Sequence, residues 1–160
     1  MLIKRFVFAV MALVIMTSAG CGFKLQGSYS IPSQLSHLSL DSQDQYSELT
    51  RLVSERLRLN SVTIEHNNSK LPVLNLLNDS LQRATLSLYP TGNVAEYELI
   101  YQVKFTVTLP KQEAQPFSVE IRRDYLDDPR TALAKSREME LLLHEMRIQA
   151  ADAIVQKLAS

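Results

Sequence analysis

The stretch from residue 96 to residue 109 alternates between polar and apolar side chains with a period of two. Polar residues occupy one side, with Ile100 as the exception, and the other side carries Tyr97, Leu99, Tyr101, Val103, Phe105, Val107 and Leu109. A period of two places successive side chains on opposite faces of a strand. One buried and one solvated face is typical of an antiparallel sheet. The stretch therefore predicts a long strand in a sheet that is covered on one face.

Shorter patterns on either side predict the remaining elements. Residues 38–40 and 117–125 alternate like strands, and residues 71–89 contain two alternating stretches with a bulge or bend at 78–80. Residues 46–59 and about 131–158 carry apolar side chains at three- and four-residue steps, as in amphipathic helices. Helices covering one face of a sheet make an economical layered fold. We expect an α+β fold with a mostly antiparallel sheet of about four strands and two helices packed on one face.

The N-terminus has the pattern of a secretory signal. Lys4 and Arg5 precede an apolar run at 6–16, and small residues follow at 18–20. Cys21, the only cysteine, comes next, in a context that resembles a lipobox with Ser18 where Leu is most common. We therefore expect a lipoprotein signal peptide at 1–20 and a diacylglyceryl anchor on Cys21. The alternatives are an uncleaved membrane anchor and a lone buried thiol.

Charge and length constrain what the mature chain can do. Cleavage after residue 20 would leave 140 residues and remove Lys4 and Arg5, so that 15 basic residues face 17 acidic ones. A chain with a net charge near −2 lacks the strongly basic face of a nucleic-acid binder. A length of 140 residues suffices for one hydrophobic core. We expect a single domain at 21–160 and no nucleic-acid partner.

The titratable residues form no recognisable catalytic or metal-binding pattern. His144 and Glu145 begin like a zinc-protease helix, but Ile148 stands where the second His is required. A surface pair between Glu140 and His144 is the favoured interpretation. The 3 histidines are scattered and have no cysteine partner. We therefore expect no catalytic residue, no metal, no cofactor and no enzymatic activity.

Three tyrosines lie on the predicted buried faces of strands. Tyr97 and Tyr101 belong to the long alternating stretch, and Tyr125 ends the last predicted strand. An aromatic ring on such a face packs in the core while its hydroxyl seeks a partner. Core packing is the favoured interpretation, and a ligand-stacking surface is the alternative.

Several segments together resemble one known family. They are CGFKLQG at 21–27, AEY at 95–97 after the Gly92 turn, DPRTALAK at 128–135 before the last helix, and, more weakly, LRLN at 57–60. Their order and spacing resemble the LPS-assembly lipoprotein family, LptE, from about residue 21 to residue 158. The fold that this resemblance implies is a four-stranded sheet with two helices.

The resemblance also implies a function and a location. It implies a non-enzymatic lipoprotein that plugs the β-barrel of the outer-membrane translocon LptD, helps that barrel to assemble, and binds lipopolysaccharide on its way to the cell surface. Gly22 after the cysteine, where Asp would mark retention in the inner membrane, implies anchoring at the periplasmic side of the outer membrane.

The resemblance carries over to one binding residue. Basic residues near the hairpin turn and after the Ala-Leu-Ala segment are linked to lipopolysaccharide in the family; Lys135 matches the second position, and Pro90 occupies the first. Proline has neither charge nor N–H donor. The alternative for Lys135 is an ordinary exposed lysine at a helix start. Alternatives for the whole chain are a scaffold lipoprotein of the barrel-folding machinery without a glycolipid ligand, and a small lipoprotein enzyme.

Overall fold

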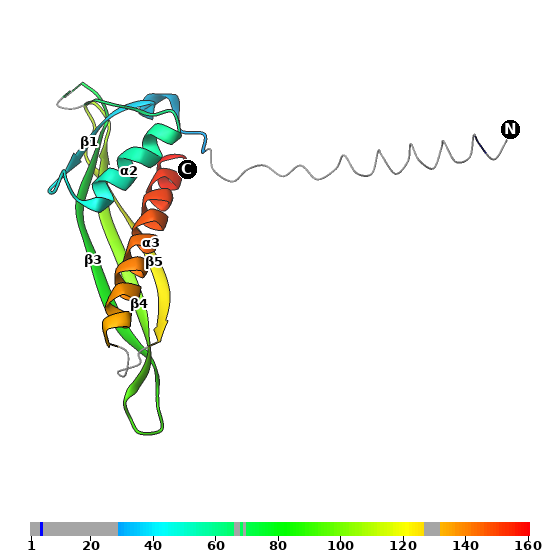
Figure 1. Ribbon diagram of the computed structural model, residues 1–160. Helices are drawn as coiled ribbons and strands as arrows, with labels where there is room; N and C mark the ends of the chain where they lie inside the picture. The colour runs from blue at the N-terminus through cyan, green and yellow to red at the C-terminus, as the bar shows by residue number, and fades with distance from the viewer. Residues whose placement is uncertain (1–3, 5–28, 66–67, 69, 127–131) are drawn as a thin grey trace.

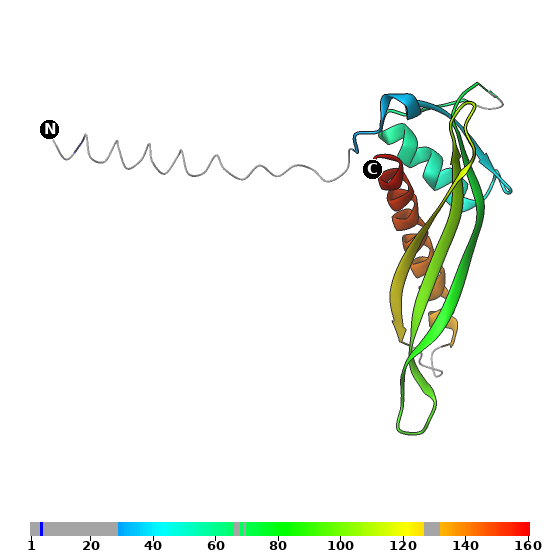
Figure 2. The same ribbon diagram turned by 180° about the vertical axis from the view of Figure 1, so that it is seen from behind.

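A single sheet with two helices on one of its faces makes up the folded part of the chain (Figures 1 and 2). The computed structural model describes residues 4, 29–65, 68, 70–126 and 132–160, with only the backbone at 132–134. Its strands are β1 (His37–Ser42), β2 (Thr63–Ile64), β3 (Val73–Leu88), β4 (Val94–Thr108) and β5 (Gln115–Leu126). Its helices are α2 (Glu48–Leu59) and α3 (Ala132–Leu158), and η1 (Ser33–Leu35) is a short 3-10 turn. The α+β prediction, with both helices on one face, is confirmed.

The sheet has one strand more than predicted, and it is mixed. Its order is β2-β1-β3-β4-β5. β3, β4 and β5 are antiparallel neighbours, whereas β1 runs parallel to both β2 and β3. Parallel neighbours need a crossover connection, and α2 supplies it between β1 and β2. Periodicity missed β2 because Thr63 and Ile64 are too few residues to show one.

β3 and β4 form a long hairpin whose tip projects beyond the first turn of α3 (Figure 1). The two stretches expected at 71–89 are one continuous strand. The predicted irregularity lies slightly earlier than expected, as a register shift between Leu76 and Asn78. The tip contains the predicted turn, where Gly92 has a φ of 85° that favours glycine.

α2 is fixed at both ends by polar contacts. The Ser47 side chain caps its N-terminus by accepting a 3.1 Å hydrogen bond from the Thr50 backbone N–H. Arg56 Nε lies 2.9 Å from Asp152 Oδ1 of α3, which joins the two helices. These contacts fix α2 against α3 on the covered face of the sheet.

The core lies between this face and the helices. As the alternation predicted, Leu99, Tyr101, Val103 and Phe105 of β4 are buried. Helix α3 contributes the buried Met146, Ala150, Ala151, Ile154 and Val155, and α2 contributes Leu49, Val53 and Leu57. None of the helices within the described ranges combines the length and apolar composition that crossing a membrane requires.

Candidate functional site

Lys135 is the predicted binding residue whose side chain the structure describes. It lies in the first turn of α3, beside the end of β5 (Figure 1). Cys21, residues 1–20 apart from Lys4, and the 128–131 part of the DPRTALAK segment lie outside the described residues. Pro90, which replaces the other expected cation, is exposed at the hairpin tip.

The Lys135 side chain packs instead of extending into solvent. Its Nζ lies 4.8 Å from the centroid of the Tyr125 ring and donates a 2.8 Å hydrogen bond to Glu138 Oε2. Only 16% of the side chain is exposed. An ammonium over an aromatic face is attracted by the negative electrostatic potential of the ring. Lys135 is therefore more than an ordinary exposed lysine: β5 and α3 hold its charge in a defined position.

A second cation lies over a second ring on the neighbouring strand. The guanidinium carbon of Arg83 in β3 lies 5.5 Å from the centroid of the Tyr97 ring in β4. Tyr97 is directly opposite Tyr125 in the β4–β5 register. Both tyrosines lie on the face that the alternation predicted to be buried, whereas no sequence pattern singled out Arg83. The strand register could have pointed to Arg83. Arg83 is directly opposite Leu99 in the antiparallel β3–β4 pair, so it is the diagonal neighbour of Tyr97, within reach of a long side chain.

Large apolar side chains are exposed around the same end of the molecule. On β3 and the following turn they are Leu86, Leu88 and Tyr89, with exposures of 50%, 60% and 42%. Leu126, at the end of β5, is 52% exposed but pairs with Glu96, on the opposite face from Tyr125. Large exposed apolar side chains that gather in one place mark sites for protein, lipid or ligand contact. We call this end, with its two cations, the distal surface: Arg83, Leu86, Leu88, Tyr89, Tyr97, Tyr125 and Lys135.

A polar cluster joins the helices to the sheet away from this end. Glu48, in the first turn of α2, accepts hydrogen bonds from His144 and Arg147 of α3. The Tyr101 hydroxyl donates a 2.6 Å hydrogen bond to Asp79 Oδ2. The expected pair between His144 and Glu140 is wrong, because His144 contacts Glu48 on the other helix. The cluster therefore connects α2, α3, β3 and β4.

The ionisation of this cluster follows from its contacts. The hydrogen bond from His144 lowers the pKa of the Glu48 carboxyl against the opposing effect of burial, and Arg147 lowers it further. Burial raises the pKa of the Tyr101 hydroxyl, and the hydrogen bond to Asp79 raises it further. Burial disfavours the charged Arg147, but hydrogen bonds with Tyr101 and Glu48 outweigh it and raise the pKa of Arg147. Glu48 and Arg147 thus stay charged at neutral pH.

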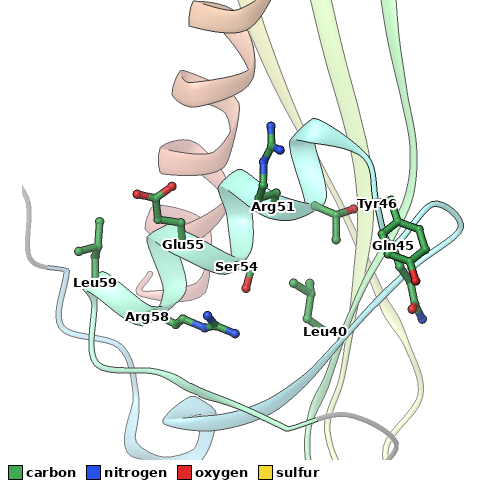
Figure 3. Close-up of a pocket in the computed structure, with 9 residues that line it drawn as sticks. Leu40, Gln45, Tyr46, Arg51, Ser54, Glu55, Arg58 and Leu59 are labelled. Carbon is green, nitrogen blue, oxygen red and sulfur yellow. The ribbon is translucent and has the colours of Figure 1, made fainter.

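A hollow of about 680 Å³ lies beside α2, at the opposite end from Lys135, and Leu40 of β1 is one of the residues that line it. Ser54 and Arg58 extend from α2 toward Leu40 (Figure 3). Tyr46 and Leu59, at its rim, are 95% and 63% exposed. Its lining does not include the predicted binding residue.

The residues that the structure describes bring together no three His, Cys, Asp or Glu side chains that could hold a metal ion. The distal surface contains two cations that lie over aromatic rings, together with exposed apolar side chains. Chemically, such a surface suits an amphiphile with anionic groups.

Known proteins match nearly the whole chain. The family LptE: Lipopolysaccharide-assembly matches residues 35–158. The chain belongs to the LptE family. The LptE relative from Yersinia enterocolitica, "LPS-assembly lipoprotein LptE", is 40% identical over 156 residues, or 96% of this chain and 75% of the relative. A relative of the same name from Pectobacterium atrosepticum is 40% identical over 151 residues, or 93% of this chain and 82% of the relative.

A solved structure agrees with this assignment to the LptE family. The crystal structure of rare lipoprotein B from Shewanella oneidensis is 72% identical and covers 77% of this chain and 93% of its own. Its TM-score of 0.71 shows that the two chains share a fold. The LptE resemblance expected from the sequence is therefore confirmed, as is the α+β fold with two helices, although the sheet has five strands and not the four that the resemblance implied.

Proposed function

We propose that this LptE-family chain is an outer-membrane lipoprotein that plugs and helps to assemble the LptD β-barrel, and that it binds lipopolysaccharide during delivery to the cell surface. The names of its relatives, LPS-assembly lipoproteins, support the role in lipopolysaccharide assembly. The observation that best supports glycolipid binding is Lys135, held over Tyr125 at the end of the sheet where Leu86 and Leu88 of the hairpin are exposed. The role is non-catalytic: the chain binds and positions other molecules.

The anchor in this proposal is acylated Cys21, at the periplasmic side of the outer membrane. More than one acyl chain gives stable membrane anchoring. The folded domain that the structure describes begins at residue 29, and Cys21 lies outside the described residues. Cys21→Ala should therefore abolish acylation and leave the domain folded. Metabolic labelling with a fatty acid tests the first point and circular dichroism the second; undiminished labelling of the variant would disprove the anchor.

The barrel partner is the second part of the proposal. Opposite the helices, the sheet presents a largely polar face with an ion network, in which Arg122 of β5 pairs with Glu98 of β4 and with Glu120. The lumen of a large outer-membrane barrel is polar and hydrated, so such a face is compatible with it. The test is to solubilise outer membranes, capture the tagged chain and identify what is bound. A stable complex with one large barrel supports the plug, whereas capture of several barrel-folding factors favours the scaffold alternative.

Glycolipid binding is tested through Lys135. The full chain, purified in detergent, is assayed for lipopolysaccharide capture at low and at high salt. Lys135→Glu should weaken capture at low salt, because it reverses a charge held at the distal surface, and added salt should weaken capture by the native chain. Lys157→Glu, an exposed lysine at the other end of α3, is the matched control and should have little effect.

Pro90→Ala supplies a further comparison within this assay. It removes only a ring at the hairpin tip, so it should change capture less than Lys135→Glu does. Equal capture by the native chain and Lys135→Glu at low salt would reject Lys135 as a contact residue. Absence of capture by the native chain would reject glycolipid binding and leave the barrel-plug proposal to the membrane experiment.

A further inference from the structure

We infer that Arg83 is a second glycolipid-contacting cation, and that Arg83 and Lys135 together bind a glycolipid head group through two phosphates. This inference rests on the proposed lipopolysaccharide binding and says which residues and which ligand groups carry it. It starts from two cations that each lie over a tyrosine ring: Arg83 of β3 lies over Tyr97 of β4, and Lys135 of α3 lies over Tyr125 of β5.

The first step is the position of the two rings. Tyr97 and Tyr125 are directly opposite in the β4–β5 register, so they project from the same face of the sheet. It is the face on which Lys135 approaches from α3. Because neighbouring strands lie about 4.8 Å apart, the two rings are neighbours on one face, and we expect a single head group to span the cations that lie over them.

The two cations differ in how much of their charge is offset by carboxylates. Glu138 pairs with Lys135 at 2.8 Å and offsets part of its charge. Arg83 contacts the uncharged Tyr97 ring, and in the part of the chain that the structure describes no carboxylate pairs with it. Two carboxylates of the β3–β4 hairpin accept hydrogen bonds from other side chains: Asp79 accepts from Tyr101, and Glu96 accepts from Ser87. Arg83 therefore presents a positive charge with donors available to an anion.

The third step is the shape of the guanidinium. Arginine offers several N–H donors in a planar fork that suits phosphate oxygens, whereas lysine acts as a point charge. Residues 88–94, which form the hairpin tip, contain neither Lys nor Arg. In β3, Arg83 is the residue with a cationic side chain, and it lies five residues before the end of the strand.

The fourth step is the apolar surface beside the cations. Leu86 and Leu88 follow Arg83 on the same strand and are half or more exposed. Phosphate-binding donors next to exposed leucines match a ligand that has phosphates on its head group and acyl chains attached to it. Of the anionic ligands that two cations can bind, this arrangement favours a phosphorylated glycolipid over free phosphate.

The experiment compares two lipids that differ in one phosphate. The full chain in detergent is assayed for capture of diphosphoryl lipid A and of monophosphoryl lipid A. The native chain should prefer the diphosphoryl form. Arg83→Gln should lower capture of the diphosphoryl form roughly two- to fivefold, the range of one exposed ion contact, and should remove the preference. Arg83→Lys, which keeps the charge, should retain most of it.

Arg123→Gln is the matched control. Leu99 of β4 is directly opposite Arg83 of β3 on one side and directly opposite Arg123 of β5 on the other. Both arginines are exposed. Arg123 has no aromatic ring contact among the described residues. Arg123→Gln should leave both capture and preference unchanged, and equal losses in Arg83→Gln and Arg123→Gln would overturn the inference in favour of diffuse attraction.

Two further outcomes separate this inference from the function on which it rests. If the native chain captures lipid A and Arg83→Gln captures it equally, with equal preference, the inference fails and the proposed binding stands. If the native chain captures neither lipid, the proposed glycolipid binding fails and the inference falls with it. Inorganic phosphate can also be added as a competitor in the capture assay. If it inhibits capture as strongly as free diphosphoryl lipid A does, the inference is overturned, because the apolar surface would then contribute nothing to binding.

Discussion

The two ends of β3 place the same residue type in opposite environments. Leu74 and Leu76, in the half that pairs with β1, are 1% and 4% exposed, whereas Leu86 and Leu88, in the hairpin, are 50% and 60% exposed. Burying a leucine contributes about 2 kcal/mol, so only the first pair can stabilise the fold to that extent. The comparison indicates that one part of the strand is committed to the core and the other is available for contact with other molecules.

A charged residue at the centre of the core should have the largest effect. Val103 is completely buried, and Val103→Asp would place an unpaired carboxylate there at a cost of several kcal/mol, on the order of the whole stability of a small domain. We expect loss of native circular dichroism and of a cooperative melting transition. Phe105→Asp should behave in the same way. A near-native melting temperature for either variant would contradict the assignment of this half of the sheet as the core.

A smaller effect is expected where the helices meet. Glu48→Gln removes the charge that His144 and Arg147 contact, and should cost about 1–2 kcal/mol at neutral pH. Because the folded-state pKa of Glu48 is lowered, its stabilisation is present above the ordinary carboxyl pKa and is lost as pH falls through the folded pKa.

The measurement is urea unfolding of both proteins at neutral and at strongly acidic pH. The stability difference between the native chain and Glu48→Gln should shrink on acidification. Glu55→Gln, on the exposed side of the same helix, should show no comparable difference at either pH. A difference for Glu48→Gln that is independent of pH would show that the ionised carboxylate is not what stabilises the interface.

The smallest effect on stability should come from the hairpin. Leu88→Ser replaces a side chain that is 60% exposed, so the free energy of unfolding should change by no more than about 0.5 kcal/mol. Leu76→Ser, on the same strand but buried, should cost about 2–4 kcal/mol. Chemical denaturation of the pair measures the contrast directly. Equal losses would show that the exposed half of β3 also stabilises the fold.

Much of the fold was predictable because long elements repeat their pattern. The alternation through Leu99, Tyr101 and Val103 predicted which face of β4 is buried, and the stripe through Met146, Ala150 and Ile154 predicted the packed side of α3. The two residues of β2 give no period to detect. Its parallel pairing with β1 depends on the crossover through α2, which no local pattern specifies.

The site was predictable only in part. Lys135 came from the family resemblance, and the inward direction of Tyr97 and Tyr125 came from the alternation. The contact of Arg83 with Tyr97 joins two strands, and the contact of His144 with Glu48 joins residues 96 positions apart. Such contacts depend on strand register and helix packing, which are set only once the whole sheet has assembled.

The position of β5 has a consequence for the solution behaviour of the chain. β5 is an edge strand of the sheet, and an open edge can pair with another strand and start aggregation. Pro116 and the charged residues Glu120, Arg122, Arg123 and Asp124 lie along this edge, and both proline and charge oppose such pairing. The composition of this one strand thereby opposes self-assembly of the chain through its sheet edge. Sedimentation of the purified chain at rising salt, which screens these charges, should show where that protection ends.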